Sequence, residues 1–224
     1  MYTILDFRNL GRSLGNRNTM VRESASVSAG NILTIKGPSG SGKSTLLRML
    51  ARLIAAESGE VYFKGTYWHA IPATDWRRSV HYVSQKPVMF RGSVEDNLRL
   101  PFALSSMKEG PSYSKQICEQ YMKTLDLPSE LLGQNAQTLS GGEASRIALI
   151  RALMIDPTVV LLDEPTAYLD DENRIRVMQL VARWVKETPG RAIIIVTHGE
   201  DDLKDLKDLT VLEMGYSQGA LHNG

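Results

Sequence analysis

The stretch that decides the fold is Gly37-Pro38-Ser39-Gly40-Ser41-Gly42-Lys43-Ser44-Thr45, which fits the pattern G-x-x-x-x-G-K-[ST]. The apolar run Ile32–Lys36 precedes it and a helical pattern follows it, which is the context that this motif needs. Its glycines let backbone N–H groups turn inward around a phosphate, and the helix N-terminus adds its positive dipole end. The stretch therefore predicts a nucleotide site in which Lys43 reaches the β- and γ-phosphates, Ser44 binds Mg²⁺ and Thr45 supports the α-phosphate side.

Outward from this motif, short apolar runs alternate with helical patterns. The runs are typical of parallel strands buried on both faces: Ile32–Ile35, Val80–Val83, Val159–Leu162 and Ile193–Val196. Three other segments place apolar residues on one helical face: Ser44–Ile54 (Leu46, Leu47, Leu50, Leu53, Ile54), Gly142–Ile155 (Ile147, Ile150, Leu153, Met154) and Glu172–Lys186 (Ile175, Met178, Val181, Val185). We therefore predict an α/β fold with a mainly parallel core sheet and right-handed crossovers.

Two regions depart from that alternation. Gly59–Gly65 alternates in polarity and, together with Thr3–Phe7 and Val21–Val27, predicts a small antiparallel edge sheet. The stretch from residue 92 to about 139 is mostly helical and contains no convincing sheet strand. We expect one domain over residues 1–224, with a nucleotide-binding core over about 1–88 and 156–224 and an inserted helical subdomain over about 89–155.

Composition limits the class of protein. The chain has 224 residues, 26 Lys+Arg against 25 Asp+Glu, 42% hydrophobic residues and a single cysteine, Cys118. The balanced charge argues against a nucleic-acid partner. One cysteine makes no internal disulfide, which favours a reducing compartment. The first residues lack a long apolar run, and no apolar stretch reaches the ~20 residues needed to cross a bilayer, so we expect a cytoplasmic chain without a signal peptide.

An acidic pair ends one of the buried strands, in Val159-Val160-Leu161-Leu162-Asp163-Glu164. This position puts Asp163 at the carboxyl edge of the sheet, where ligands bind in open α/β folds. There Asp163 can hold Mg²⁺ beside the phosphate motif. Glu164 follows directly and is placed to polarise a water for attack on the γ-phosphate, although capping the turn before Pro165 would also account for it.

A third motif, Leu139-Ser140-Gly141-Gly142-Glu143, lies between the other two. Ser140 and Glu143 have the spacing of a capping box, and the paired glycines expose N–H groups at the positive end of the following helix. Helix capping alone explains these residues, but the same geometry is also an anion site. With the three motifs in this order, the chain resembles the ATP-binding cassette (ABC) ATPases, whose signature is L-S-G-G-Q or L-S-G-G-E.

The resemblance covers essentially the whole chain and implies further roles. It implies that Gln85 senses Mg²⁺ and the attacking water, that His198 contacts the γ-phosphate and that Asp170 lies across a dimer contact. It implies a head-to-tail dimer in which each ATP lies between the phosphate motif of one chain and the Ser140–Glu143 segment of the other. Glu164 is then the candidate general base, and the implied metal-binding residues are Ser44, Gln85 and Asp163. The family usually stacks an aromatic residue on adenine where this chain has Leu14, which leaves selectivity for ATP over GTP open.

The segment after Gln85 points to a membrane partner. In the family this region forms the groove for a coupling helix, so we expect a separate polytopic permease to dock near residues 85–102 and to hold the chain at the inner face of the cell membrane. The pattern from Phe90 to Asn97 resembles exporter-type cassettes, and the short single cassette looks most like small bacterial ATPases of iron export and metal resistance.

Two other classes of ABC protein compete with a transport subunit. An ABC ATPase that works mechanically on a membrane complex, in division or lipoprotein release, remains the alternative. Types that act on DNA are disfavoured because no sustained heptads lie between the phosphate motif and the signature. Types that act on ribosomes are disfavoured because they carry two cassettes.

Overall fold

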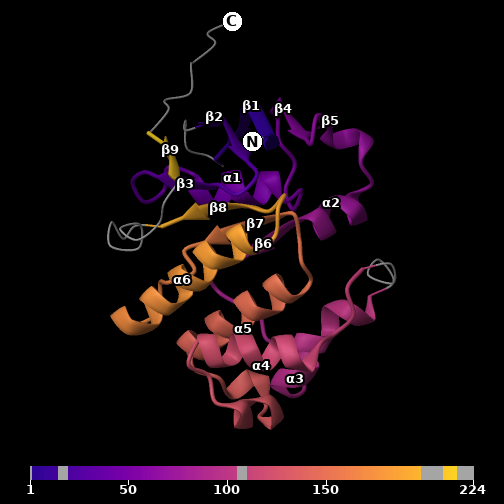
Figure 1. Ribbon diagram of the computed structural model, residues 1–224. Coiled ribbons are helices and arrows are strands. Elements are labelled where there is room, and N and C mark those ends of the chain that lie inside the picture. The colour runs from indigo at the N-terminus through magenta and orange to yellow at the C-terminus, as the bar shows by residue number, and fades with distance from the viewer. Residues whose placement is uncertain (1, 15–19, 105–109, 198–208, 216–224) are drawn as a thin grey trace, which may run out of the picture.

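The computed structural model describes residues 2–14, 20–104, 110–197 and 209–215. These residues form two sheets, which lie in the upper part of the view in Figure 1. A five-stranded parallel sheet has the order β6-β7-β8-β3-β9. Its strands are β3 (Ile32–Lys36), β6 (Val80–Val83), β7 (Val159–Asp163), β8 (Ala192–Val196) and β9 (Leu209–Glu213). A four-stranded antiparallel sheet has the order β2-β1-β4-β5, with β1 (Thr3–Ser13), β2 (Met20–Ser28), β4 (Ser58–Phe63) and β5 (Thr66–Tyr67). The four predicted parallel strands and the predicted edge sheet are confirmed.

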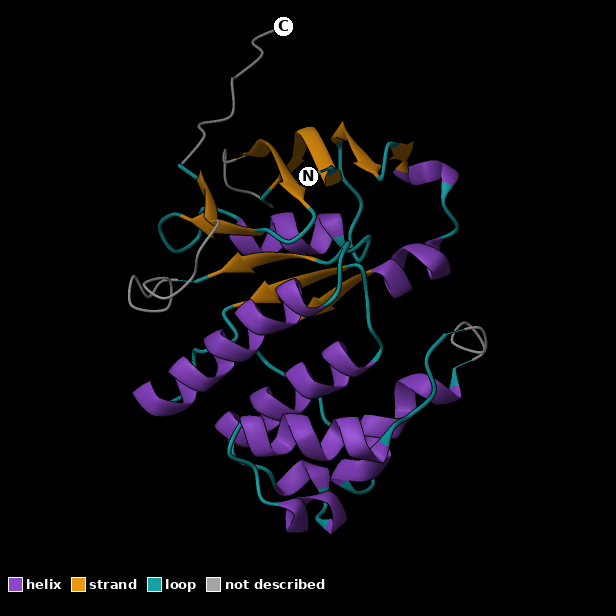
Figure 2. Cartoon of the chain, in the orientation of Figure 1, coloured by secondary structure: helices purple, strands orange, loops and turns teal. Residues whose placement is uncertain are grey.

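Helices separate and cover these sheets (Figure 1). The helix α1 (Lys43–Leu50) lies between the antiparallel and the parallel sheet, whereas α6 (Asp171–Glu187) and α5 (Gly141–Met154) lie on the other side of the parallel sheet. Figure 2 shows that the end farthest from the antiparallel sheet is built of helices and loops. The remaining elements are α2 (Ala73–Ser79), α3 (Val94–Arg99) and α4 (Lys115–Thr124), with 3₁₀ turns at η1 (Trp68–Ala70), η2 (Leu100–Ala103), η4 (Ser129–Gly133) and η5 (Ala136–Thr138).

The parallel sheet is buried on both faces, because successive side chains of a strand point to opposite sides. In β7, Val160 and Leu162 belong to the apolar cluster that contains α5 and α6, whereas Val159 and Leu161 belong to the cluster that contains α1. This double burial explains why the strands read as continuous apolar runs rather than as alternating ones.

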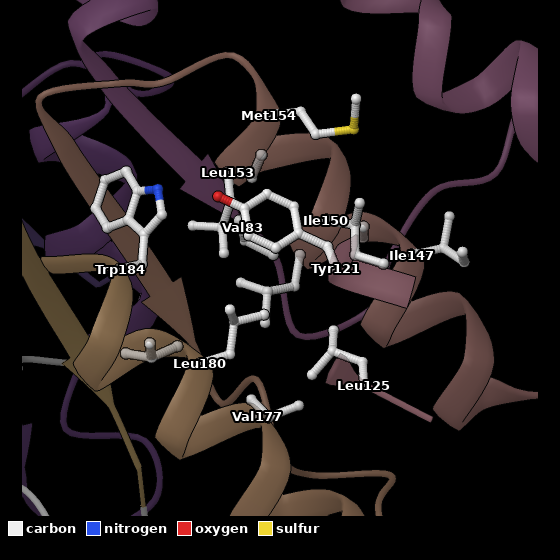
Figure 3. Packing of buried hydrophobic residues seen from close by; sticks show 14 of the residues in the cluster. Val83, Tyr121, Leu125, Ile147, Ile150, Leu153, Met154, Val177, Leu180 and Trp184 are labelled. Carbon is white, nitrogen blue, oxygen red and sulfur yellow. The ribbon is translucent and has the colours of Figure 1, made fainter. Parts of the chain in front are cut away.

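The first of these clusters ties the helical end to the sheet. Figure 3 shows Ile150 and Leu153 of α5 beside Leu180 and Trp184 of α6, with Tyr121 of α4 between them. Ile150 and Trp184 are fully buried, and Tyr121 is 9% exposed. Three helices from distant parts of the chain therefore share one core with the sheet face above them.

Some predicted details are wrong. The first helix ends at Leu50 and not at Ile54, because Arg52 adopts a left-handed backbone with φ 54°. Leu53 is consequently 52% exposed, and Ile175 on α6 is 51% exposed although we expected both on buried faces. The strand β9 was not predicted, since its sequence, LTVLE, gives only a short and partly polar run.

None of the helices in the described ranges combines the length and the apolar composition that a bilayer span requires.

Candidate nucleotide site

The phosphate motif forms a loop between β3 and α1, which we call the P-loop (Gly37–Thr45). Gly42 caps α1 with φ 95° and ψ 15°, a left-handed conformation that glycine adopts without strain. A Cβ on Gly42 would lie 2.1 Å from Val21 Cγ2 and 3.3 Å from Leu14 Cδ1, and one on Gly37 would lie 2.4 Å from the Met214 carbonyl oxygen. Neighbouring chain segments thus press on the loop at two positions where only glycine fits.

Lys43 is folded back onto the loop. Its Nζ donates to the carbonyl oxygens of Gly37 at 2.8 Å and Pro38 at 3.0 Å, and the residue is only 5% exposed. Burial lowers the pKa of Lys43, while the carboxylates of Glu164 and Asp163 act in the opposite direction. A phosphate in the loop would offer this partly desolvated ammonium an anionic acceptor in place of two neutral carbonyls, which makes a stronger hydrogen bond.

Asp163, at the end of β7, holds two hydroxyl groups. It is 2% exposed, and its Oδ1 accepts a hydrogen bond from Ser44 Oγ at 2.9 Å. Its Oδ2 accepts one from the Tyr82 hydroxyl at 2.8 Å, and Arg48 Nε lies 3.4 Å from the same hydroxyl oxygen. Burial raises the pKa of Tyr82 to about 12, so the hydroxyl keeps its proton and acts as a donor. Ser44 and Asp163 thus meet as predicted, whereas Tyr82 and Arg48 were not predicted as site residues.

These oxygen atoms suit Mg²⁺, a hard cation that prefers oxygen ligands and keeps waters or substrate phosphates around it. The Ser44 hydroxyl and the Asp163 carboxylate supply such oxygens side by side. In the described part of the chain, no three or more His, Cys, Asp and Glu side chains are grouped so that they could hold a metal ion. The Ser44 and Asp163 oxygens fit a magnesium ion that arrives with a nucleotide.

Glu164 follows in a left-handed backbone conformation with φ 48°, which costs a non-glycine residue on the order of 1–3 kcal/mol and is often found at functional sites. Its N–H donates to the Val196 carbonyl of β8 at 3.0 Å. Gln85 Nε2 donates to Glu164 Oε2 at 2.7 Å. Because β6 and β7 are adjacent, the residues that follow them meet, which brings together Gln85 and Glu164, two separately predicted site residues.

The Leu139–Glu143 segment, which we call the signature segment, begins α5 with the predicted capping box. Ser140 Oγ accepts from the Glu143 N–H at 3.2 Å, and Glu143 Oε2 accepts from the Ser140 N–H at 2.8 Å. The hydrogen bonds from Ser140 lower the pKa of Glu143. A Cβ on Gly142 would lie 3.2 Å from the Tyr168 carbonyl oxygen, so the segment before α6 packs against the signature segment.

Asp170 is the N-cap of α6. Its carboxylate accepts from the Asn173 N–H at 2.9 Å and from the Asn173 amide at 3.0 Å, and the first of these bonds is the main reason why the pKa of Asp170 is lowered. Asn173 also accepts from Arg146 Nη1 at 2.7 Å, which links Asp170 to the signature helix.

The site residues therefore form two groups in the described part of the chain. One joins the P-loop to Gln85, Asp163 and Glu164, and the other joins the signature segment to Asp170. Their helices pack on opposite faces of the parallel sheet (Figure 1). His198 lies outside the described residues.

Comparison with known proteins shows to which family this chain is related. The profile of the family described as ABC transporter matches residues 22–167. The "Probable iron export ATP-binding protein FetA" of Escherichia coli (strain K12) is 35% identical over 210 residues, which are 94% of this chain and 91% of that protein. The protein STAR1 of Oryza sativa subsp. japonica is 37% identical over 83% of this chain, which spans 52% of that protein. A sulfate/thiosulfate import ATP-binding protein of Halalkalibacterium halodurans is 34% identical over 92% of this chain, which spans 57% of it.

Solved structures share the fold at 23% identity. One is a bacterial Atm1-family ABC exporter with ATP bound, with a TM-score of 0.79 over 97% of this chain and 38% of that chain. Another is a dimeric ATP-binding cassette in a post-hydrolysis state with ADP and Pi, with a TM-score of 0.76 over 94% of this chain and 96% of that chain. Because the family profile covers more than half of the sequence and the E. coli relative is matched along nearly its whole length, the chain belongs to the ABC transporter family, as one of its ATP-hydrolysing nucleotide-binding subunits.

Proposed function

We propose that this chain hydrolyses ATP as a head-to-tail homodimer around two Mg–ATP and drives a separate membrane permease. The observation that most supports this proposal is that Asp163 and Glu164 lie beside the P-loop. Ser44 donates a hydrogen bond to the Asp163 carboxylate, and Gln85 donates one to the Glu164 carboxylate. These are the groups that a phosphoryl transfer to water needs: a phosphate cradle, oxygen ligands for a cation and a base.

These groups have different roles in hydrolysis. Lys43 and the N–H groups of the P-loop stabilise the charge that develops on the phosphates. Ser44, Asp163 and Gln85 would hold Mg²⁺, which when bound neutralises phosphate charge. Glu164 accepts the proton of the attacking water, and the Gln85 amide orients its carboxylate. His198 would hold the γ-phosphate and the water in line.

The position of the signature segment supports the homodimer. Its helix α5 lies across the parallel sheet from α1 (Figure 1), and Ser140 and Gly141 at its start are exposed, which supports contact with the nucleotide of a second chain. Gly141 and Gly142 present backbone N–H groups at a positive helix end, which attracts an anion. Asp170, tied to the same helix through Asn173, would lie at the contact. Hydrolysis removes the γ-phosphate bridge and lets the chains separate.

The catalytic assignment is tested with Glu164→Gln. This variant keeps the shape of the site and loses the base, so it should hydrolyse ATP at a rate at least about a hundredfold below the original chain. Its dimer should persist with ATP in light scattering coupled to gel filtration and dissociate with ADP. Glu187→Gln, which removes a carboxylate that pairs with Arg183 near the end of α6, serves as the matched control. Robust turnover by Glu164→Gln would refute the role of Glu164.

The permease would dock near residues 85–102, where the surface is apolar. Val88 is 59% and Phe90 is 50% exposed, and Arg151 of α5 donates to the Val88 carbonyl at 3.1 Å. A movement of this loop would thus reach α5. We propose that residues about 89–155 form a helical subdomain inserted in a nucleotide-binding core over about 1–88 and 156–224. Such docking would place the chain peripherally at the inner face of the cell membrane.

Docking is tested by co-purification with the polytopic membrane protein that an adjacent gene encodes. Val88→Asp and Phe90→Asp should abolish co-purification while ATP hydrolysis by the free chain continues. Recovery of a division or lipoprotein-release membrane protein would favour mechanical work on a membrane complex instead. Equal recovery with both variants would refute docking at this surface.

Metal or iron export is the transport class that we propose, supported by the similarity to the probable iron export ATP-binding protein of E. coli. Deletion of the gene should raise cellular iron and sensitivity to added iron, and the original gene should reverse both, whereas the Glu164→Gln form should not. Unchanged iron content would exclude iron as the substrate and leave the ATPase assignment intact.

A further inference from the structure

Tyr82 contacts the carboxylate at the centre of the site, although the mechanism above gives it no role. It lies on β6, where it is in register with Leu161 of β7, two residues before Asp163. From there its hydroxyl donates to Asp163 Oδ2 at 2.8 Å, and Arg48 Nε approaches the hydroxyl oxygen at 3.4 Å. A side chain of one strand thus holds the acid at the end of the next.

The two oxygens of Asp163 are held from opposite directions. Ser44 of α1 donates to Oδ1, and Tyr82 of β6 donates to Oδ2. Since Asp163 is 2% exposed, rotation of its carboxylate would leave a buried charged oxygen without its donor, which is unfavourable. The plane of the carboxylate is therefore fixed by two elements, and one of them carries no residue of the three nucleotide motifs.

We propose that Tyr82 is a positioning residue, which holds the Asp163 carboxylate in the orientation that Mg²⁺ of Mg–ATP requires. The inference rests on the proposed function, because it presupposes a metal at Ser44 and Asp163. Groups that hydrogen-bond a ligating carboxylate orient it, and their removal commonly weakens metal binding by 10–100-fold. Arg48 supports the arrangement by donating to the Tyr82 oxygen.

A role in packing alone would give a different result. The Tyr82 ring packs partly buried against the cluster that contains α1. Phenylalanine retains that packing and removes only the hydroxyl, so Tyr82→Phe separates the two roles. Tyr62→Phe is a matched control, because the Tyr62 hydroxyl also donates to a carboxylate, Glu60 Oε2 at 3.0 Å, but does so on the antiparallel sheet.

The experiment measures binding of a fluorescent ATP analogue to the full chain, first in EDTA and then with increasing Mg²⁺. In Tyr82→Phe, the Mg²⁺ concentration that gives half of the metal-dependent increase in binding should rise about tenfold, while the dissociation constant in EDTA changes by less than about twofold. Tyr62→Phe should leave both quantities unchanged. An unchanged Mg²⁺ requirement in Tyr82→Phe, or an equal loss of binding with and without Mg²⁺, overturns the inference.

A double variant tests the route through Asp163. If Tyr82 acts by orienting that carboxylate, Tyr82→Phe should add almost nothing to the Mg²⁺ requirement of Asp163→Asn, whereas independent effects would multiply. An original chain that binds no nucleotide would refute the proposed function itself. If the unsubstituted chain shows Mg²⁺-dependent binding and Tyr82→Phe binds in the same way, only the role of Tyr82 is refuted and the proposed function stands.

Discussion

Gly42→Ala should damage both the fold and nucleotide binding, for a reason visible in the backbone. Gly42 has φ 95°, and a Cβ there would lie 2.1 Å from Val21 Cγ2, where carbon atoms normally approach to about 3.5–4.0 Å. Val21 is 1% exposed and belongs to the apolar cluster that contains α1, so it has little room to withdraw. The substitution therefore meets both backbone strain and a steric clash.

The two effects can be sized separately. A left-handed conformation costs an alanine about 1–2 kcal/mol. Forcing an extra methyl into a packed site costs about 1–3 kcal/mol. We expect Gly42→Ala to lower the free energy of unfolding by about 2–5 kcal/mol. Gly30→Ala has the first effect alone, since Gly30 has φ 77° and no heavy atom within 4 Å of its added Cβ, so we expect about 1–2 kcal/mol.

Urea unfolding of the two variants, of Val21→Ala and of the double variant Val21→Ala with Gly42→Ala measures these quantities. The double variant should lose less stability than the sum of the losses in Val21→Ala and Gly42→Ala, with a coupling energy of about 1–3 kcal/mol, because the missing methyl groups of Val21 make room for the new one. Binding of a fluorescent ATP analogue should fall at least about tenfold in Gly42→Ala and stay unchanged in Gly30→Ala. Equal destabilisation by Gly42→Ala and Gly30→Ala, or additive effects in the double variant, would refute this reasoning.

Three further predictions follow from single contacts. Burial lowers the pKa of His81 to about 4 from 6.5, so the unfolded chain takes up this proton first, and the free energy of unfolding should fall as the pH drops from 6.5 toward 4, by at most about 1.4 kcal/mol per pH unit. Urea unfolding at several pH values should show a shallower fall in His81→Gln, and an identical slope would contradict the assignment. Asn97 is 1% exposed and bonds to the Phe90 N–H, the Phe90 carbonyl and the Ser93 carbonyl, so Asn97→Ala should lower the free energy of unfolding by about 2–4 kcal/mol and leave nucleotide binding intact, whereas a loss below about 0.5 kcal/mol would mean that water replaces these bonds. Ser140→Ala removes the N-cap of α5 and should lower the free energy of unfolding by about 1 kcal/mol; placed in Glu164→Gln, it should also prevent ATP-dependent dimerisation in gel filtration, and a persistent dimer would remove Ser140 from the interface.

The sequence was sufficient for the sheet core because its strands are buried on both faces. Val159–Asp163 and Ala192–Val196 are fully buried strands, and such strands leave an unbroken apolar run that no surface requirement interrupts. The strand β9, at the edge beside β3, needs apolar residues at fewer positions. Its Thr210 and Glu213 interrupt the apolar run by which a strand is predicted from sequence. The end of α1 was missed for a tertiary reason, since the Arg52 guanidinium donates to the carbonyls of Trp68 and Ile71, which are distant in sequence.

In the site, too, contacts between residues close in sequence could be predicted, whereas contacts between distant residues could not. Ser140 and Glu143 are three residues apart, so their capping box could be predicted from spacing alone. Tyr82 could not be found in this way, because its role depends on the lateral order of β6 and β7. One signal was available: a polar aromatic residue inside a run otherwise expected to be fully buried, which usually means that its hydroxyl has a partner.

The expected metal ligands, Ser44 and Asp163, and the phosphate-binding Lys43 differ in how far they must rearrange when a nucleotide binds. The Ser44 hydroxyl donates to Asp163, and a donating hydroxyl still has lone pairs to offer a cation, so this bond need not break when a metal binds. The Asp163 carboxylate likewise keeps acceptor sites beyond those that Ser44 and Tyr82 use. Lys43, by contrast, donates to the carbonyls of Gly37 and Pro38, so a bound phosphate would compete with both for its ammonium. Nucleotide binding should therefore reorganise the Lys43 side chain far more than the metal ligands, and this asymmetry is the reason to seek the effect of Tyr82 in the Mg²⁺ requirement and not in metal-free binding.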